Sequence, residues 1–371
     1  MTLYPNLILD ALKGVRYPGN GKSLAENNMI EDDIRIDGNK VSFSLIFDRP
    51  TDPFIRSVVR AAEAAIAANI SPDVDATIAV KTKTAAPAPK PAVLPGVKNI
   101  VGISSGKGGV GKSTVSANLA VALAAKGYKV GLLDADIFGP SMPKMFGVED
   151  QGLYMVNKEG RDWIEPIERY GVKMLSIGFL VDKEKPVLWR GGMASNALKQ
   201  LITDAWWGDL DYFLIDMPPG TSDIHLTLVQ TLPITGIVVV STPQEVALAD
   251  ARKGLAMFTG QQVNVPILGL VENMAWFTPE KHPDEKYFIF GEGGAVRLAE
   301  EQGVKLLAQI PLVMDIRQRA DDGAPVAIEL EKDPATTNPE ARAFATLADN
   351  VVEAVKERNE SLPPTQKVET H

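Results

Sequence analysis

From residue 97 onward, short apolar runs alternate with segments of helical periodicity. The runs are rich in β-branched residues, which is typical of strands buried on both faces. They are Asn99–Ser104, Lys129–Asp134, Val172–Ile177, Tyr212–Asp216, Ile234–Ser241 and Val265–Glu272, and the helical patterns include Lys112–Lys126, Ser195–Ala205, Glu245–Gly260 and Ala295–Gln302. This alternation predicts a doubly wound α/β domain with a mostly parallel sheet, whose functional residues lie at the carboxyl ends of the strands.

The pattern before residue 82 is different and predicts a small α+β module. Two alternating segments flank Asp37-Gly38-Asn39, and Asp-Gly in that setting is a strong hairpin signal. The expected elements are a helix at Asn6–Leu12, the hairpin strands Ile34–Ile36 and Lys40–Phe47, a helix at Pro53–Ala68 and a strand at Ala76–Val80.

The two patterns are separated by Thr82–Pro95, which is rich in alanine and proline. Such a composition cannot build a core and is typical of a semi-rigid, extended linker. We therefore expect a small domain over residues 1–81, a linker over 82–96 and a large α/β domain over 97–371.

Charge and composition narrow the classes of function. The 371 residues have a formal net charge of −9, which argues against broad nucleic-acid binding because that needs a clustered basic face. No apolar run approaches the roughly 18 residues of a membrane span, and the first residues do not resemble a secretory signal. We therefore expect a cytoplasmic protein with no membrane partner. The chain has no cysteine, which excludes disulfides and a thiolate nucleophile.

A glycine-rich segment follows the first predicted strand of the large domain and opens its first helix. It reads GKGGVGKST and fits the P-loop pattern G-x-x-x-x-G-K-[ST]. Its glycines let backbone N–H groups face a phosphate, and the helix N-terminus adds a positive dipole end. Lys112 is expected to reach the β- and γ-phosphates, and the Ser113 hydroxyl to bind Mg²⁺. The residues expected to bind ATP here are Gly106, Lys107, Gly108, Gly109, Val110, Gly111, Lys112, Ser113 and Thr114. The alternative is a glycine-rich turn without a ligand.

Three aspartates follow predicted strands that end at the same edge of the sheet. Asp134 and Asp136 flank Ala135 at the end of one strand, and Asp216 ends the four-residue apolar run that starts at Tyr212. A buried strand that delivers one carboxylate to the Mg²⁺ coordination sphere is the arrangement of a Walker-B motif, which makes Asp216 a metal candidate. For Asp134 and Asp136, an ordinary helix N-cap is the alternative.

The loop Lys107-Gly-Gly-Val-Gly-Lys-Ser113 resembles that of the deviant Walker-A ATPases, which include MinD, ParA, the nitrogenase iron protein and Mrp. The resemblance implies a homodimer in which Lys107 reaches the partner's phosphates. It also implies that Asp136 positions the attacking water and that Asp134 lies nearer the metal shell, so the catalytic candidates are Lys107, Lys112 and Asp136. A solvated surface lysine is the alternative for Lys107.

Further motifs resemble the Mrp/ApbC family, whose members are treated as iron–sulfur cluster carriers. They are DADIFGPSMP at Asp134–Pro143, WRGG at Trp189–Gly192, DMPPGTSD at Asp216–Asp223, VVVSTP at Val238–Pro243, and Glu272-Asn273-Met274 followed by FGEGG at Phe290–Gly294. The resemblance spans residues 97–358, and the N-terminal module resembles the small domain of iron–sulfur assembly factors. It implies that Asn273 contacts the adenine; the alternative is a capping or turn residue after a strand.

The chain departs from that family where cysteines are expected. The family's Cys-x-x-Cys falls within Ala275–Ile289, which has no cysteine, and Asp52 stands where the small domain commonly has one. Clusters are normally held by Cys thiolates, so the usual cluster site cannot form. His282, Asp284 and Glu285, with Glu280 nearby, suit a different metal, but a solvated charged loop is the favoured interpretation.

We therefore expect an Mg²⁺-dependent ATPase that acts in iron–sulfur cluster assembly or transfer, with apo iron–sulfur proteins or assembly factors as partners. One alternative is a localisation ATPase like MinD or ParA. The apolar face of Pro339–Arg358 could suit a membrane-binding helix, but its polar face is mixed in charge, which favours packing on the domain. Another alternative is an ATPase whose client is a different metal or protein.

Overall fold

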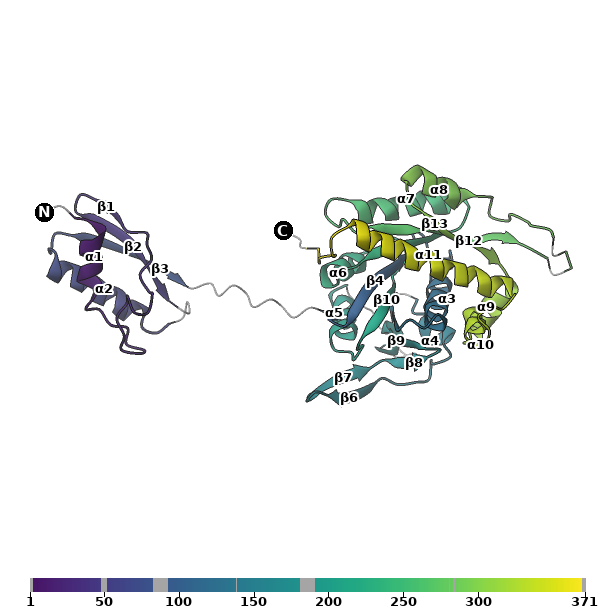
Figure 1. The fold of residues 1–371 in the computed structure, drawn as a ribbon, viewed down its shortest axis with the longest axis horizontal. Coiled ribbons are helices and arrows are strands. Elements are labelled where there is room, and N and C mark those ends of the chain that lie inside the picture. The colour runs from purple at the N-terminus through teal and green to yellow at the C-terminus, as the bar shows by residue number, and fades with distance from the viewer. Residues whose placement is uncertain are drawn as a thin grey trace. The chain divides into compact units, whose positions relative to one another are not determined.

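The computed structural model describes residues 3–47, 52–82, 93–137, 139–180, 191–279, 281–282 and 284–368. The chain divides into two compact units, Met1–Pro91 and Ala92–His371. Figure 1 shows the elements of each unit. Part of the Trp189–Gly192 motif and most of the proposed linker lie outside the described residues.

The small unit packs two helices against a three-stranded sheet. The helices are α1 (Pro5–Leu12) and α2 (Ile55–Asn69), and the strands are β1 (Arg35–Asp37), β2 (Lys40–Phe47) and β3 (Asp75–Thr82), in the order β1-β2-β3. β1 and β2 are antiparallel and joined through Gly38 at φ +59°, whereas β2 and β3 are parallel. Alternate residues of β2 are buried with Ile8, Leu12 and Ile66, so the hairpin and the α+β class predicted from the sequence are confirmed.

The large unit is built on an eight-stranded sheet with the order β13-β12-β11-β4-β10-β5-β9-β8. All neighbouring pairs are parallel except β8–β9 at one edge. The strands are β4 (Val97–Ser104), β5 (Val130–Asp134), β8 (Ile167–Arg169), β9 (Val172–Ser176), β10 (Leu210–Asp216), β11 (Gly236–Ser241), β12 (Ile267–Phe277) and β13 (Leu306–Leu312). The predicted doubly wound, mostly parallel sheet is confirmed.

Helices cover both faces of this sheet because the central strands are apolar on both sides. Val101 and Ile103 of β4 pack into one core, and Ile100 packs into the other. The first core includes α3 (Lys112–Ala125), α4 (Met142–Met145), α9 (Met314–Asp321), α10 (Glu329–Lys332) and α11 (Pro339–Ser361), and the second includes α5 (Gly191–Thr203), α6 (Asp223–Thr231), α7 (Glu245–Thr259) and α8 (Gly294–Gln302).

Helix α11 buries the apolar face that the sequence shows. Phe344, Leu347 and Val351 are fully buried in the core beside α3, so this helix packs on its own domain as expected. No helix in the described part of the chain is long and apolar enough to cross a membrane.

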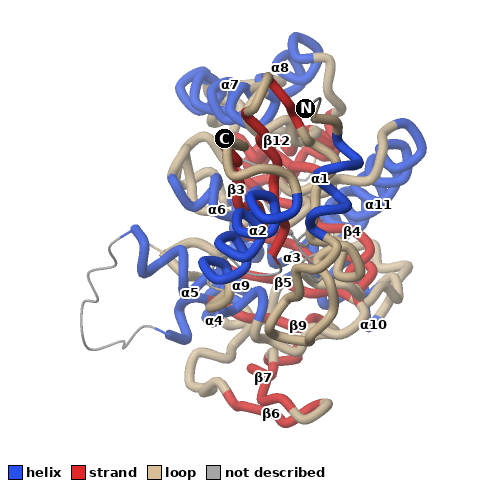
Figure 2. The backbone as a smooth tube through the Cα atoms, turned by 90° about the vertical axis from the view of Figure 1, so that its left-hand side faces the viewer, coloured by secondary structure: helices blue, strands red, loops and turns tan. Residues whose placement is uncertain are grey.

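The sequence patterns did not indicate every element. The antiparallel pair β6 (Tyr154–Lys158) and β7 (Arg161–Glu165) extends from the large unit in Figures 1 and 2. All residues of the two strands are exposed or half-buried, so no buried apolar run marks the pair. The strand predicted at Val265–Glu272 also continues to Phe277, which places Asn273 within β12.

Candidate nucleotide site

The strand register brings the candidate carboxylates together. β10 lies between β4 and β5, and its last residue, Asp216, pairs with Asp134 on one side and Ile103 on the other. The P-loop starts directly after β4, so it leaves the sheet beside both aspartates. Asp134 and Asp216 are fully buried and Asp136 is nearly so, which places three acidic side chains under the loop.

The loop backbone depends on glycine at specific positions. Gly109 and Gly111 have φ of +82° and +81°, a region that favours glycine. A Cβ at Gly106 would lie 2.2 Å from the carbonyl carbon of Asp250 in α7. The glycine spacing of the motif is thus required both by the turn and by the helix packed behind it.

Lys112 is buried and lies among the acidic side chains. Its Nζ is 2.7 Å from Asp216 Oδ2 and 3.8 Å from Asp136 Oδ2, and it donates to Ser113 Oγ at 3.2 Å. A buried cation this close to carboxylates offsets part of their desolvation cost. The ammonium group is therefore held at the N-terminus of α3, where an incoming phosphate would compete with Asp216 for it.

Asp216 has a hydroxyl partner on each oxygen. Ser113 Oγ donates to Oδ2 at 2.7 Å, and Ser116 Oγ donates to Oδ1 at 2.6 Å. Ser116 was not among the residues predicted from the sequence. It lies three residues after Ser113, which places the two hydroxyls on one face of α3, so helical spacing was the signal that could have found it.

Asp134 is held by backbone and side-chain donors. Its Oδ2 accepts from Met142 N at 3.1 Å and Ser176 Oγ at 2.9 Å, and its Oδ1 accepts from Asp136 N at 3.2 Å. Burial first, and then the nearby charge of Asp216, raises the pKa of Asp134 to about 7. Ser176 also escaped the sequence prediction, although its place at the end of β9, paired with Asp134, follows from the parallel order of the strands.

Asn273 contacts the P-loop directly. Its Nδ2 donates to the Val110 carbonyl at 2.8 Å, and a Cβ at Gly111 would lie only 2.2 Å from that nitrogen. The preceding Glu272 is fully buried and accepts from Ala295 N at 2.6 Å and Gln309 Nε2 at 2.7 Å. Asn273 is thus a fixed residue of β12 and not a turn residue after it.

Lys107 differs from the other candidates because it is exposed. Only its carbonyl is engaged by a neighbour in the described structure, where it accepts from Ser105 Oγ at 3.0 Å. An exposed lysine on the loop is compatible with either a solvated side chain or contact with a second molecule.

The segment after β12 has a different character. His282 Nδ1 lies 3.4 Å from Glu285 Oε1, with both side chains about half exposed or more, at 61% and 49%. No group of three or more His, Asp or Glu residues in the described ranges is arranged to hold a metal, and Glu280 lies outside those ranges. This geometry favours the solvated charged loop.

Asp52 has a structural position at the start of α2. It accepts from Phe54 N at 2.8 Å and from the Tyr17 hydroxyl at 2.5 Å. The aspartate that stands in place of a cysteine thus joins the helix start to the loop that contains Tyr17.

Comparison with known proteins supports the resemblance seen in the sequence. The family described as ParA, NUBPL iron-transfer P-loop NTPase, matches residues 96–352, and the iron–sulfur cluster assembly protein family matches residues 6–80. An iron–sulfur cluster carrier protein of Synechocystis is 44% identical over 88% of this chain and 92% of its own length. An Arabidopsis thaliana iron–sulfur protein required for mitochondrial NADH dehydrogenase is 48% identical over 72% of this chain and 82% of its own.

One solved structure agrees with this placement. A nucleotide-binding protein from Archaeoglobus fulgidus, in complex with ADP, is 39% identical and covers 62% of this chain and 88% of its own, with a TM-score of 0.54. The cell-division ATPase MinD of Pyrococcus furiosus, at 24% identity, 69% and 98% coverage and a TM-score of 0.46, is too distant to indicate a shared function. The chain therefore belongs to the NUBPL iron-transfer family of ParA-type P-loop NTPases.

Proposed function

We propose that this protein binds and hydrolyses ATP with Mg²⁺ at the P-loop and acts in iron–sulfur cluster assembly or transfer in the cytoplasm, without cysteine ligands of its own. The observation that carries the proposal is the buried group of Lys112, Asp134 and Asp216, with Ser113 and Ser116 bonded to Asp216, directly under a glycine-rich loop. The names of the relatives and the A. fulgidus neighbour with ADP support both halves of it.

The residues present suit a Mg²⁺ ion. Magnesium prefers oxygen ligands, and the Ser113 hydroxyl and the Asp216 carboxylate supply oxygens 2.7 Å apart, with Asp134 beside them. Burial, and then the charge of Asp216, raises the pKa of Asp134, and a divalent cation beside both carboxylates would offset this repulsion. When bound, the ion would neutralise charge on the β- and γ-phosphates.

The reaction is in-line attack of water on the γ-phosphate, which passes to that water as ADP leaves. Backbone N–H groups of residues 108–111 would face the phosphates. The Lys112 ammonium group would leave Asp216 and pair with the β- and γ-phosphate oxygens. Asp136, 3.8 Å from Lys112, orients the attacking water. Asn273 holds the loop through the Val110 carbonyl. In this proposal it also contacts the adenine.

The exposed Lys107 is the residue through which a homodimer would take part in hydrolysis. In a second copy packed against this face, the side chain would reach the partner's phosphates and stabilise the charge that develops as the bond breaks. Each site would then be complete only in the dimer.

Cysteine thiolates are the usual ligands of iron–sulfur clusters, and this chain has none. The cluster is a cargo in this proposal, so its ligands must come from a partner protein. ATP binding would change the conformation of the complex with that partner. It would not act on a cluster held by this chain itself.

Two measurements test the proposal separately. Phosphate release from ATP should require Mg²⁺ and should increase with protein concentration as dimers form; no turnover with any nucleotide, with or without partner proteins, would refute the ATPase. Transfer of a cluster to an apo acceptor should occur under anaerobic conditions only when a cluster-bearing partner is present. Equal transfer rates with and without this protein would refute the role in iron–sulfur chemistry.

A further inference from the structure

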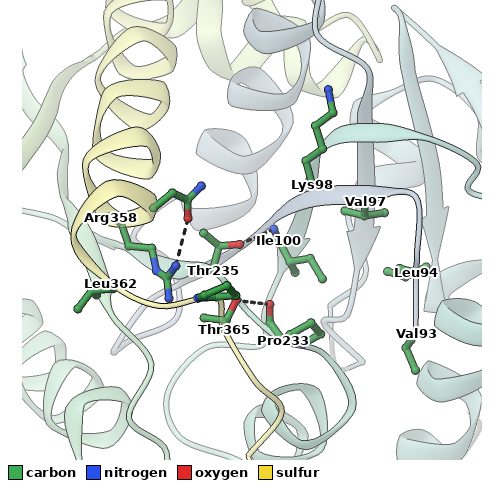
Figure 3. A pocket seen from close by; sticks show the side chains of 12 residues that line it. Val93, Leu94, Val97, Lys98, Ile100, Pro233, Thr235, Arg358, Leu362 and Thr365 are labelled. Atoms are coloured by element: carbon green, nitrogen blue, oxygen red, sulfur yellow. Dashed lines mark hydrogen bonds between the residues drawn. The ribbon is translucent and has the colours of Figure 1, made fainter. Parts of the chain in front are cut away.

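A cavity of about 350 Å³ lies at the amino-terminal edge of the large sheet, the edge opposite the P-loop. Its walls come from the start of β4 with the residues before it, the residues before β11, the end of α11 and the tail that follows (Figure 3). β4 spans eight residues from this edge to the P-loop, which at about 3.3 Å per residue separates the two places by roughly 25 Å.

One part of the lining is apolar. Val93, Leu94, Val97, Ile100, Leu362 and Pro364 contribute to it. A cavity of this size falls within the range that holds small organic ligands, about 300–1,000 Å³. An apolar tail of a few carbon atoms would be desolvated against these side chains.

Arg358, near the end of α11, supplies the charge in this cavity. Its Nη1 donates to Asn359 Oδ1 at 3.1 Å and its Nη2 to the Pro363 carbonyl at 2.8 Å. Its Nε is shielded from solvent and has no hydrogen-bond partner. Burial lowers the pKa of this guanidinium, as expected for a partly desolvated charge.

The other polar groups of the lining already have partners. Lys98 Nζ lies 2.8 Å from Asp211 Oδ1, Thr235 Oγ1 accepts from Ile100 N at 3.0 Å, and Thr365 Oγ1 donates to the Pro233 carbonyl at 3.1 Å. In the described part of the lining, Arg358 is therefore the cation that faces the cavity without an acidic partner.

The chemistry of the guanidinium selects the ligand class. Nε–H and an N–H of Nη2 point from one edge of the group and match the two oxygens of a carboxylate. The Nε–H has no acceptor in this structure, and a carboxylate on this edge of the guanidinium would supply one. We propose that this cavity binds a small amphipathic carboxylate, with its head on Arg358 and its apolar tail against Val93, Leu94 and Val97.

Octanoate is a suitable probe, and octanamide is its neutral counterpart. Equilibrium dialysis of the full-length protein, saturated with ADP to occupy the P-loop, should give one octanoate per chain. Arg358→Gln should weaken binding about tenfold or more, as expected for a lost charged hydrogen bond. Arg342→Gln, on the same helix but outside the cavity, should bind within about twofold of the wild type.

A second variant keeps the test valid if Arg358→Gln folds poorly. Leu362→Trp leaves Arg358 in place and narrows the cavity, so it should also weaken octanoate. The proposal fails if octanamide binds as well as octanoate, if both variants bind like the wild type, or if octanoate binds the ADP-free protein but not the ADP-saturated protein.

Discussion

The nucleotide site under the P-loop and the segment that follows β12 differ in how firmly their polar side chains are held. At the P-loop, Lys112, Asp134 and Asp216 are buried, and each meets two or more polar partners. In the segment after β12, His282 and Glu285 are largely exposed and contact each other at 3.4 Å. A preorganised site keeps its groups fixed before the ligand arrives. The comparison therefore favours the nucleotide site, and not the segment after β12, as the place of the proposed reaction.

The largest expected effect comes from Lys112→Ala. Losing two charged contacts to phosphate, at about 1.5–3 kcal/mol each, should weaken ATP binding by about 100-fold or more. Fluorescence titration with a labelled ATP analogue measures it. Circular dichroism must show a folded variant, since the change also leaves buried acids without their cation; tight binding by a folded variant would contradict the site.

Lys107→Ala should separate binding from hydrolysis. The side chain is exposed, so the free energy of unfolding should not change, and the nucleotide affinity should stay within about twofold of the wild type. Hydrolysis should fall by about 100-fold or more, because the positive side chain that the partner supplies would no longer stabilise the charge that develops in the reaction. Lys253→Ala, an exposed lysine of α7, is the matched control. Unchanged turnover would remove the argument for a shared active site.

Ser116→Ala should have an intermediate effect. It leaves the buried Oδ1 of Asp216 without its hydroxyl donor, which costs about 1–3 kcal/mol of the free energy of unfolding. Urea denaturation measures the loss, and steady-state hydrolysis should fall several-fold because Asp216 is less well oriented. Ser361→Ala removes an exposed helical hydroxyl that donates only to carbonyls, and it should change neither quantity.

The raised pKa of Asp134 predicts a pH dependence of the nucleotide-free protein. An acid whose folded pKa is about 7 and whose ordinary value is 3.8 binds more protons in the folded state between those values. Its contribution to stability is therefore present below about pH 4 and is lost as the pH rises towards 7. Urea denaturation of wild type and Asp134→Asn should show the wild type losing stability relative to the variant over this window.

Asp33 of the small unit is a control, because its pKa is shifted in the opposite direction. A hydrogen bond from Ser44 and the neighbouring Lys81 lower its pKa to about 2, so its contribution should be lost only as the pH falls from about 4 to 2. The same direction for both aspartates would contradict the assigned environments.

The smallest effect is expected in the segment after β12. His282→Ala and Glu285→Gln change exposed side chains whose mutual contact is worth little in water. ATP affinity and turnover should both stay within about twofold of the wild type. A large loss of either would show that this segment takes part in the nucleotide reaction. The contrast between the nucleotide site and the segment after β12 would then not hold.

Sequence patterns were sufficient for the parallel sheet and the P-loop because both depend on local features. Apolar runs mark β4, β5 and β10, and the glycine spacing marks the turn at Gly109 and Gly111. Ser176 and Asn273 have roles that depend on which strands are neighbours, and strand order is set by tertiary packing. The pair β6–β7 escaped because a largely exposed hairpin lacks the alternating burial that identifies a strand.

The fit between Gly111 and Asn273 has a consequence for protein engineering. Because a Cβ at 111 would overlap the amide of 273, the loop is not a self-contained cassette of nine residues. A P-loop transplanted from this chain into another scaffold needs an asparagine, or an equivalent space, delivered by a strand more than 150 residues away in the sequence. The portable unit is the loop together with the end of β12.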